Sequence, residues 1–348
     1  MKILMTDSKN DRLLAHFYSA HLKEIHGVQL ASLDYVDKLN RLNESIINRI
    51  AQRALPYIYL KEINRNIIRS VEAFKPDLIW IFKGMEIFPE TLEYAKKKGI
   101  KLVNYNPDHP FFFAASGSGN AFVKNSIPVY DLHLSYSHKI LNDLWAGYQI
   151  KGEYLPFGFE ISDQIYARSA SVPEIEKACF VGRADDERHR VIQLLLKQGI
   201  PVDVYGPGWD KYFKNNGKQK VSDGVYDDSL WTVIRSYRLQ LNVFRPQNHN
   251  SHNMRSFEIP GIGGIMLAPW SEEHIAFFES GREAYFFKND EDLVRLSRKI
   301  LALDKNQALE IRQAARLRSV RDGYSYTERS KQAYGYFTRL FNNMTSNT

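Results

Sequence analysis

The segment KACFVGRADDERHRVIQLLLK, residues 177–197, indicates the fold class of the chain. Its first five residues have the length and apolar content of a buried strand, and residues 186–197 have the spacing of a helix. A turn that contains Gly182 joins the two. Strand–turn–helix units of this kind build parallel sheets whose two faces are covered by helices.

The same alternation of apolar runs and helical stretches extends along the chain. Apolar runs predict strands at 2–6, 28–33, 77–82, 101–105, 131–134, 177–181, 202–205, 239–244, 264–268 and 284–287. Helical spacing is found at 11–25, 37–53, 59–74, 88–98, 186–197, 254–261, 290–303, 305–319 and 325–342. The pattern predicts an α/β protein of two Rossmann-like, doubly wound domains. Ligands of such sheets bind beyond the carboxyl ends of the strands, so we expect the two domains to face each other across a cleft.

The boundary between the domains is predicted from a break in this pattern. The segment Tyr154-Leu-Pro-Phe-Gly158 interrupts the alternation, and a polar stretch at 162–176 follows. We therefore expect an N-terminal domain at 1–160 and a second domain at 161–325. A C-terminal helix at 326–348 is expected to pack back on the N-terminal domain.

Composition excludes several classes of protein. Of the 348 residues, 44% are hydrophobic and 25% are charged, as in ordinary globular domains. The single cysteine, Cys179, excludes a disulfide framework and a Cys-rich zinc site. No apolar run approaches the roughly 18 residues of a membrane span, and the apolar start of the chain is too short for a signal peptide. The sequence predicts a reduced, soluble, cytoplasmic protein.

The formal charge of +7 is spread over both halves of the chain, which disfavours nucleic-acid binding. One local excess exists, since residues 305–339 hold eight Lys or Arg and three Asp or Glu. It is typical of a solvated helical face. The alternative is a surface for an anionic membrane or an acidic partner, which would place the protein at a membrane periphery.

The turn after residue 181 has the chemistry of a phosphate site. Gly182 lets an anion approach the backbone, and the helix that follows presents free N–H groups at its start. Arg183 and Arg188 add two charged donors, as a diphosphate requires. In the alternative interpretation, Arg188 and Arg190 pair with the acidic residues 185–187 on a surface helix.

The short helix at 254–261 carries Arg255 and Glu258 among apolar neighbours. A carboxylate in such surroundings needs a partner. Glu258 could accept two hydrogen bonds from a ribose diol, or it could pair with Arg255 three residues earlier. Both interpretations stay open.

Asp108 and His109 follow the fourth predicted strand, where polar side chains face a ligand in this architecture. They are candidates for acid–base catalysis or for sugar contacts. In the alternative interpretation, Asn106-Pro-Asp108 is a turn closed by an Asx hydrogen bond.

The segment Gly206-Pro-Gly-Trp209 also follows a strand. Trp209 could present its ring to a nucleotide base, or it could pack as an ordinary buried aromatic residue.

The motifs of the second half, taken in order, resemble one known family. They are FVGR at 180–183, VDVYGPGW at 202–209, RSFEIPGIGG at 255–264, FFESGRE at 277–283, NDEDL at 289–293 and YSYTER at 324–329. Together they resemble the CgeB-like, spore-maturation type of glycosyltransferase, a relative of the group 1 enzymes with the two-domain GT-B fold. The likeness covers residues 177–330, and residues 1–176 match mainly in layout.

The resemblance implies a bacterial enzyme that moves a sugar from a nucleoside-diphosphate sugar to an unidentified glycan, lipid-linked glycan, protein or small molecule. It implies that Gly182, Arg183, Arg188 and Arg255 bind the donor diphosphate and that Glu258 binds the ribose. The residues expected near the base or sugar of the donor are Gly206, Trp209, Asn250 and Gly261. Asn250 stands where the related enzymes often carry a second Glu.

We expect no cofactor and no metal, because arginines and helix N-termini can neutralise a departing diphosphate. Residues 290–292, Asp-Glu-Asp, resemble a glycosyltransferase metal motif, but they are more typical of a helix start. His249 and His252 lack a third ligand. Because Asn250 departs from the family pattern and residues 7–10 form no glycine-rich loop, a non-catalytic nucleotide- or glycan-binding protein on the same fold is the alternative function.

Overall fold

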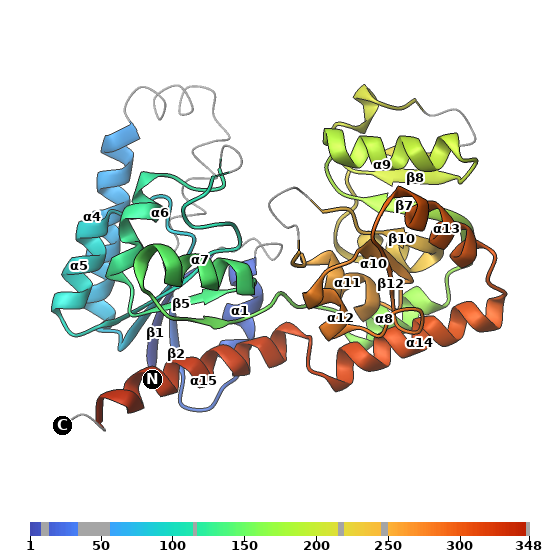
Figure 1. Ribbon diagram of the computed structural model, residues 1–348. Helices are drawn as coiled ribbons and strands as arrows, with labels where there is room; N and C mark the ends of the chain where they lie inside the picture. The colour runs from blue at the N-terminus through green and yellow to red at the C-terminus, as the bar shows by residue number, and fades with distance from the viewer. Residues whose placement is uncertain (8–13, 34–55, 114–116, 215–218, 245–249, 346–348) are drawn as a thin grey trace. The chain divides into compact units, whose positions relative to one another are not determined.

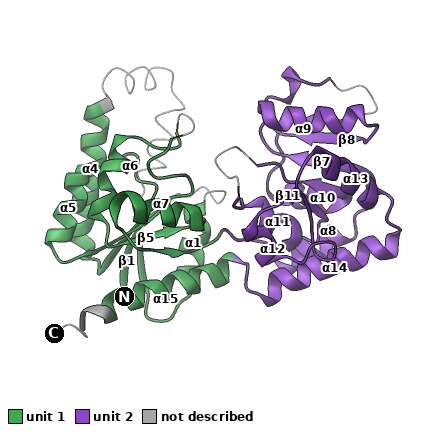
Figure 2. Ribbon diagram, in the orientation of Figure 1, with its two compact units in different colours: residues 1–156, 326–348 green, residues 157–325 purple. Residues whose placement is uncertain are grey.

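In the computed structural model the chain forms two compact units (Figures 1 and 2). Unit 1 comprises Met1–Pro156 and Tyr326–Thr348, and unit 2 comprises Phe157–Ser325. The structure describes residues 1–7, 14–33, 56–113, 117–214, 219–244 and 250–345.

Unit 1 is built on a parallel sheet with the strand order β2-β1-β3-β4-β5-β6. Its strands are β1 (Lys2–Thr6), β2 (Gln29–Leu33), β3 (Leu78–Phe82), β4 (Lys101–Tyr105), β5 (Leu132–Ser135) and β6 (Gly152–Tyr154). Its helices are α1 (Leu14–Leu22), α4 (Pro56–Phe74), α5 (Pro89–Lys97), α6 (Ala121–Ser126), α7 (His138–Tyr148) and α15 (Tyr326–Thr345), with a 3₁₀ turn at Ile127–Val129.

Unit 2 is built on a second parallel sheet with the order β12-β11-β10-β7-β8-β9. Its strands are β7 (Ile175–Val181), β8 (Val202–Tyr205), β9 (Val221–Ser222), β10 (Tyr237–Leu241), β11 (Met266–Pro269) and β12 (Tyr285–Phe287). Its helices are α8 (Asp163–Ala170), α9 (Asp186–Lys197), α10 (Asp227–Ser236), α11 (Arg255–Gly261), α12 (Glu272–Phe277), α13 (Asp290–Leu301) and α14 (Lys305–Arg321), with a 3₁₀ turn at Trp209–Lys211. This is the strand order of dinucleotide-binding sheets, in which the order of the strands reverses between the first and fourth strands, here the parallel pair β7 and β10.

The predicted α/β class is confirmed, and ten of the strands lie at or near their predicted positions. Two differences concern weak local signals. The polar stretch at 162–176, which served to place the predicted domain boundary, contains α8, whose first turn is capped by the Ser162 hydroxyl accepting the N–H of Ile165. The short edge strands β6 and β9 were not predicted, since two or three residues carry no periodicity. The helix predicted at 37–53 lies outside the described residues.

Helix α15 belongs to unit 1, although unit 2 separates it from the rest of that unit in the sequence. The rings of Phe17 on α1 and Tyr326 on α15 stack with centroids 4.9 Å apart. Phe337 meets Trp80 of β3 edge-on at 5.0 Å, and both side chains are fully buried. The last helix of the chain therefore completes the core of the unit that contains the N-terminus.

The basic excess of residues 305–339 is largely neutralised within the fold. Arg312 is buried against Glu174 at 2.7 Å, and Lys305 has no ion pair with the described residues. The other basic side chains with carboxylate partners are Arg316, Arg318, Arg321, Lys331 and Arg339. The count of basic residues therefore overstates the free positive charge of this region.

No helix within the described ranges combines the length and hydropathy that crossing a membrane requires.

The replacement Phe337→Ala should lower the free energy of unfolding of unit 1 by about 3–5 kcal/mol, because it leaves a cavity against Trp80. Urea denaturation followed by circular dichroism measures this loss. Leu317→Ala on α14 is the matched control, since that side chain is 65% exposed and should cost little. Equal losses in the two variants would contradict the role assigned to α15.

Candidate functional site

The carboxyl edge of the unit 2 sheet is shaped by two turns that lie against each other. The Gly182 N–H after β7 donates to the Tyr205 carbonyl at 2.8 Å, and the Ala184 N–H donates to the Pro207 carbonyl at 3.0 Å. Gly206 has a φ of 148°, and a Cβ there would collide with the Gly182 carbonyl. Glycine at 206 is therefore required for the turn after β8 to support the turn after β7.

Trp209 serves this same support rather than a ligand. Its side chain is fully buried in the core of unit 2, and its Nε1–H donates to the Gly182 carbonyl at 2.8 Å. The Trp209 ring faces the core and is not exposed to a base, and its place near the base or sugar of a donor stays a prediction. The alternative of a packed aromatic residue is confirmed.

The two arginines of the turn after β7 differ in what they contact. Arg183 is exposed and its side chain has no ion pair or hydrogen bond with the described residues. Arg188 is nearly buried, and it donates to the carbonyls of Arg183 at 3.0 Å and Val243 at 3.3 Å. Arg188 therefore ties the turn after β7 to the segment after β10, while Arg183 stays available to a ligand.

The predicted alternative pairing on α9 is also present. Arg188 lies 3.2 Å from Asp185, whose carboxylate accepts the Arg188 N–H and caps the helix. Arg190 pairs with Glu187 and, at 2.7 Å, with Asp290. The acidic residues at the start of α9 thus neutralise Arg188 and Arg190 and leave Arg183 without a partner among the described residues.

Glu258 lies on α11 and is only 7% exposed. Arg255 donates to its Oε2, so the expected pair three residues apart exists. Its Oε1 has no hydrogen-bond partner among the described residues. One carboxylate oxygen is held in place and the other remains free to accept hydrogen bonds.

A buried chain of hydrogen bonds fixes α11 to the ends of β10 and β11. Asn242 donates from Nδ2 to the Ser256 hydroxyl at 3.1 Å, and that hydroxyl donates to Nε2 of His274 at 2.8 Å. His274 in turn donates from Nδ1 to the Pro269 carbonyl at 2.9 Å. Burial lowers the pKa of His274 to about 4, so the ring is neutral near pH 7 and holds one tautomer.

A second buried group holds the segment before α11. Glu273 accepts from the Ser251 hydroxyl at 2.6 Å and from Nδ1 of His252 at 2.7 Å. Nε2 of His252 accepts the N–H of Phe157 at 3.3 Å. Asn250 precedes this segment as an exposed residue with a φ of 62°.

Gly261 ends α11 in a packing role. A Cβ at this position would lie 2.8 Å from the Phe159 ring, and the Gly261 carbonyl accepts from Arg316 at 2.8 Å. Its contacts are with the interior of unit 2.

Sequence reasoning missed Asn242, Ser256, Glu273 and His274. The signal that could have found them is their place shortly after strands. Asn242 follows β10 directly, and Ser271, which caps α12 by accepting the His274 N–H, follows β11 closely. Polar residues directly after buried parallel strands reach the ligand-binding edge of the sheet.

The candidate acid–base residues belong to unit 1, after β4. The Asp108 N–H donates to Asn106 Oδ1 at 3.0 Å, so the predicted Asx turn is present. The Asp108 carboxylate forms an ion pair with Lys83 at 2.6 Å. Lys83, which prediction also missed, has a φ of 61° directly after β3 and donates to the Gly117 carbonyl at 2.6 Å.

His109 has no free ring nitrogen. Nδ1 accepts the Phe112 N–H at 3.1 Å, which leaves the proton on Nε2 to be donated to Asp143 at 3.1 Å. Burial lowers the pKa of His109, so the neutral ring is favoured. Both nitrogens of His109 therefore help to hold the loop and α7 together, and its acid–base role stays a prediction.

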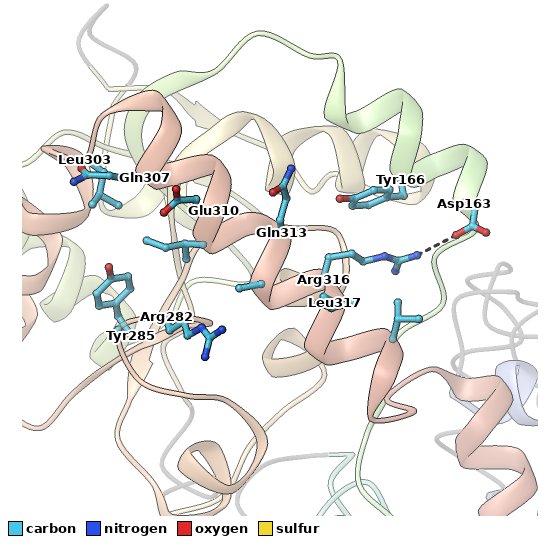
Figure 3. A pocket seen from close by; sticks show the side chains of 14 residues that line it. Asp163, Tyr166, Arg282, Tyr285, Leu303, Gln307, Glu310, Gln313, Arg316 and Leu317 are labelled. Atoms are coloured by element: carbon cyan, nitrogen blue, oxygen red, sulfur yellow. Dashed lines mark hydrogen bonds and ion pairs between the residues drawn. The ribbon is translucent and has the colours of Figure 1, made fainter.

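A surface hollow of about 940 Å³ lies elsewhere on unit 2, against α14 (Figure 3). The walls of the hollow include Tyr285, which is the first residue of β12. The hollow therefore lies toward the amino ends of the strands. Arg316 crosses it to Asp163 at 3.2 Å and lies 4.7 Å from the centre of the Tyr166 ring. None of the predicted site residues lines this hollow.

Within the described ranges, no three His, Cys, Asp or Glu side chains are grouped as metal ligands. Asp290 and Asp292 lie in the first turn of α13, as predicted, and pair with Arg190 and Arg295. His252 is held by Glu273, and His249 lies outside the described residues.

Comparison with known sequences and structures bears on the region just described. Residues 187–335 match the family described as "Glycosyl transferase-like". This part of the chain is glycosyltransferase-like. It begins directly after the turn that holds Arg183 and includes Arg188, Arg255 and Glu258. A search of curated proteins found no match.

Solved structures match over nearly the whole chain. Sucrose-phosphate synthase from Thermosynechococcus elongatus has a TM-score of 0.68 at 11% identity, covering 99% of this chain and 100% of its own. Anabaena Alr3699/HepE in complex with UDP-glucose has a TM-score of 0.64 at 13% identity, covering 97% and 100%. A structure described as a UDP-N-acetylglucosamine 2-epimerase from Listeria monocytogenes has a TM-score of 0.57 at 10% identity, covering 98% and 97%. The fold is therefore GT-B.

Unit 2 should lose stability as the pH falls from about 6.5 to about 4. His274 in the unfolded chain binds a proton near pH 6.5, whereas the folded, buried ring binds it only near pH 4. The variant His274→Gln should show a shallower fall in the free energy of unfolding over this window. Urea denaturation at several pH values measures the slope.

The exposed His26 provides the control, because His26→Gln should follow the wild-type slope. If His274→Gln also ran parallel to the wild type, His274 would not be the buried neutral group described.

Proposed function

We propose that the protein is a glycosyltransferase that takes a sugar from a nucleoside-diphosphate donor. The match of residues 187–335 to a glycosyl transferase-like family carries the proposal. The GT-B fold is consistent with it, and one structure of similar fold is a complex with UDP-glucose. The motifs at 180–183 and 255–264 further favour the CgeB-like branch.

The donor would bind at the carboxyl edge of the unit 2 sheet. Arg183 is exposed beside the start of α9, so its guanidinium and the first N–H groups of that helix suit a diphosphate. The free Oε1 of Glu258 suits a ribose hydroxyl. Arg188 would act by positioning the turn, because its donors already hold two carbonyls.

Negative charge develops on the diphosphate as the bond to the sugar breaks. Fixed cations and N–H groups stabilise such charge without having to reorient. Removal of one such donor typically lowers the rate by about 10²–10³. We therefore expect turnover of the sugar nucleotide to persist in excess EDTA. Loss of turnover in EDTA, restored by Mg²⁺ or Mn²⁺, would contradict metal independence.

The donor site predicts selective stabilisation by nucleotides. A nucleoside diphosphate or its sugar at 100 times its dissociation constant should stabilise unit 2 by about 2.7 kcal/mol. Arg183→Ala and Glu258→Gln should lose most of the resulting shift in melting temperature. Arg282→Ala, an exposed arginine on the α14 side, is the matched control and should keep it. Differential scanning fluorimetry with UDP, GDP, ADP and their glucose conjugates measures the shifts.

A turnover assay distinguishes glycosyl transfer from the other activities found on this fold. Products of the best sugar nucleotide, analysed with and without candidate acceptors, should show release of the diphosphate and transfer of the sugar. Interconversion of the sugar without release would favour an epimerase, and binding without turnover would favour the non-catalytic alternative. The absence of stabilisation by every nucleotide would overturn the donor assignment.

A further inference from the structure

Lys83 and Asn106 directly follow two neighbouring strands of the unit 1 sheet. β3 and β4 are paired with Phe82 opposite Tyr105, and the Lys83 N–H donates to the Tyr105 carbonyl at 2.9 Å. Asn106 is the next residue after β4. Both residues therefore lie at the carboxyl edge, where the ligands of parallel sheets bind.

The Asn106 side chain contains a buried donor with no partner. Its Oδ1 accepts the Asp108 N–H at 3.0 Å, which settles which end of the amide is oxygen, since the amino end could not accept that hydrogen. Its Nδ2 is buried and has no hydrogen-bond partner among the residues that the structure describes, and the whole residue is 4% exposed. An unsatisfied buried donor is costly, and one in a native fold calls for a ligand or an ordered water.

Two further features belong to the same turn. The Asp108–Lys83 ion pair is partly exposed, with side chains 27% and 25% accessible. Phe112 is 62% exposed, and its backbone N–H is fixed to Nδ1 of His109, whose ring lies 4.6 Å from the Phe112 ring. The same turn thus contains a buried unsatisfied donor, a partly exposed ion pair and an exposed aromatic ring.

We propose that this turn binds a saccharide, with Asn106 Nδ2–H donating to a hydroxyl oxygen. Asp108 accepts from a neighbouring hydroxyl, and the Phe112 ring covers the C–H face of the sugar. A lipid chain would leave the Asn106 donor unsatisfied, and a free phosphate would meet the charge of Asp108 without using Phe112. The proposal rests on the proposed function, for which it names the acceptor class.

Binding to the full-length protein tests this directly. The probes are the methyl glycosides of α-D-glucose, α-D-mannose and β-D-galactose, with hexyl phosphate and N-acetyl-serine amide as the contrasting ligands. Saturation-transfer NMR should detect at least one glycoside and should place its C–H face against an aromatic side chain.

Three variants and one control distinguish the contacts of Asn106 from those of Phe112. Asn106→Asp keeps an oxygen for the Asp108 N–H but removes the donor, so the glycoside dissociation constant should rise about 5- to 100-fold. Phe112→Leu should weaken binding similarly, whereas Phe112→Trp should retain it because the ring is kept. Trp145→Ala is the control, since Trp145 is 46% exposed on α7 two residues from Asp143, on another side of the helix.

Several results would overturn the proposal. They are the absence of saturation transfer to every glycoside, glycoside affinity unchanged in Asn106→Asp with the fold intact by circular dichroism, and preferential binding of hexyl phosphate or the serine amide. An ordered water alone would leave the glycosides unbound. Nucleotide-induced melting shifts report on unit 2, so a failed donor site and a failed saccharide site give different results.

Discussion

The Arg188 guanidinium lies where the unit 2 sheet reverses its strand order, between the turn after β7 and the segment after β10. The Arg183 and Val243 carbonyls both accept from this guanidinium, so a single cation holds the two segments at a fixed separation. Gly206 and Trp209 support the first turn from the side of β8. The second is held through Asn242 and Ser256. The placement of Arg183 and Glu258 depends on these supports.

Candidate residues fall into two groups according to whether their polar atoms are already occupied. Arg188, Trp209 and His109 have theirs bonded to protein groups, so they shape the turns. Arg183, Oε1 of Glu258 and Nδ2 of Asn106 keep atoms that no described residue satisfies. A hydrogen bond from a ligand to an atom of the second kind contributes most to the binding free energy. It satisfies an unpaired polar atom, and no hydrogen bond within the protein has to break.

Much of the fold could be predicted because its strands are buried on both faces. β3, with the sequence LIWIF, is a continuous apolar run between helices, and such a run requires few long-range contacts to recognise. The site was less accessible to prediction. Arg183 and Glu258 were found because they lie in local motifs, but the type of residue alone did not reveal that Trp209 faces the core or that both nitrogens of His109 are bonded. Lys83 meets Asp108 only because β3 and β4 are neighbours, a pairing that the local sequence around Lys83 does not encode.

Because α15 belongs to unit 1 but follows unit 2 in the sequence, the residues of unit 2 are all synthesised before those of unit 1 are complete. Unit 2 is one continuous stretch, so all of its residues have been made before the first residue of α15 is added. Unit 1 receives Tyr326 and Phe337, which cover Phe17 and Trp80, only as the chain ends. Because domains generally fold as units as they emerge during synthesis, the half of the protein that is translated first is the half that finishes folding last.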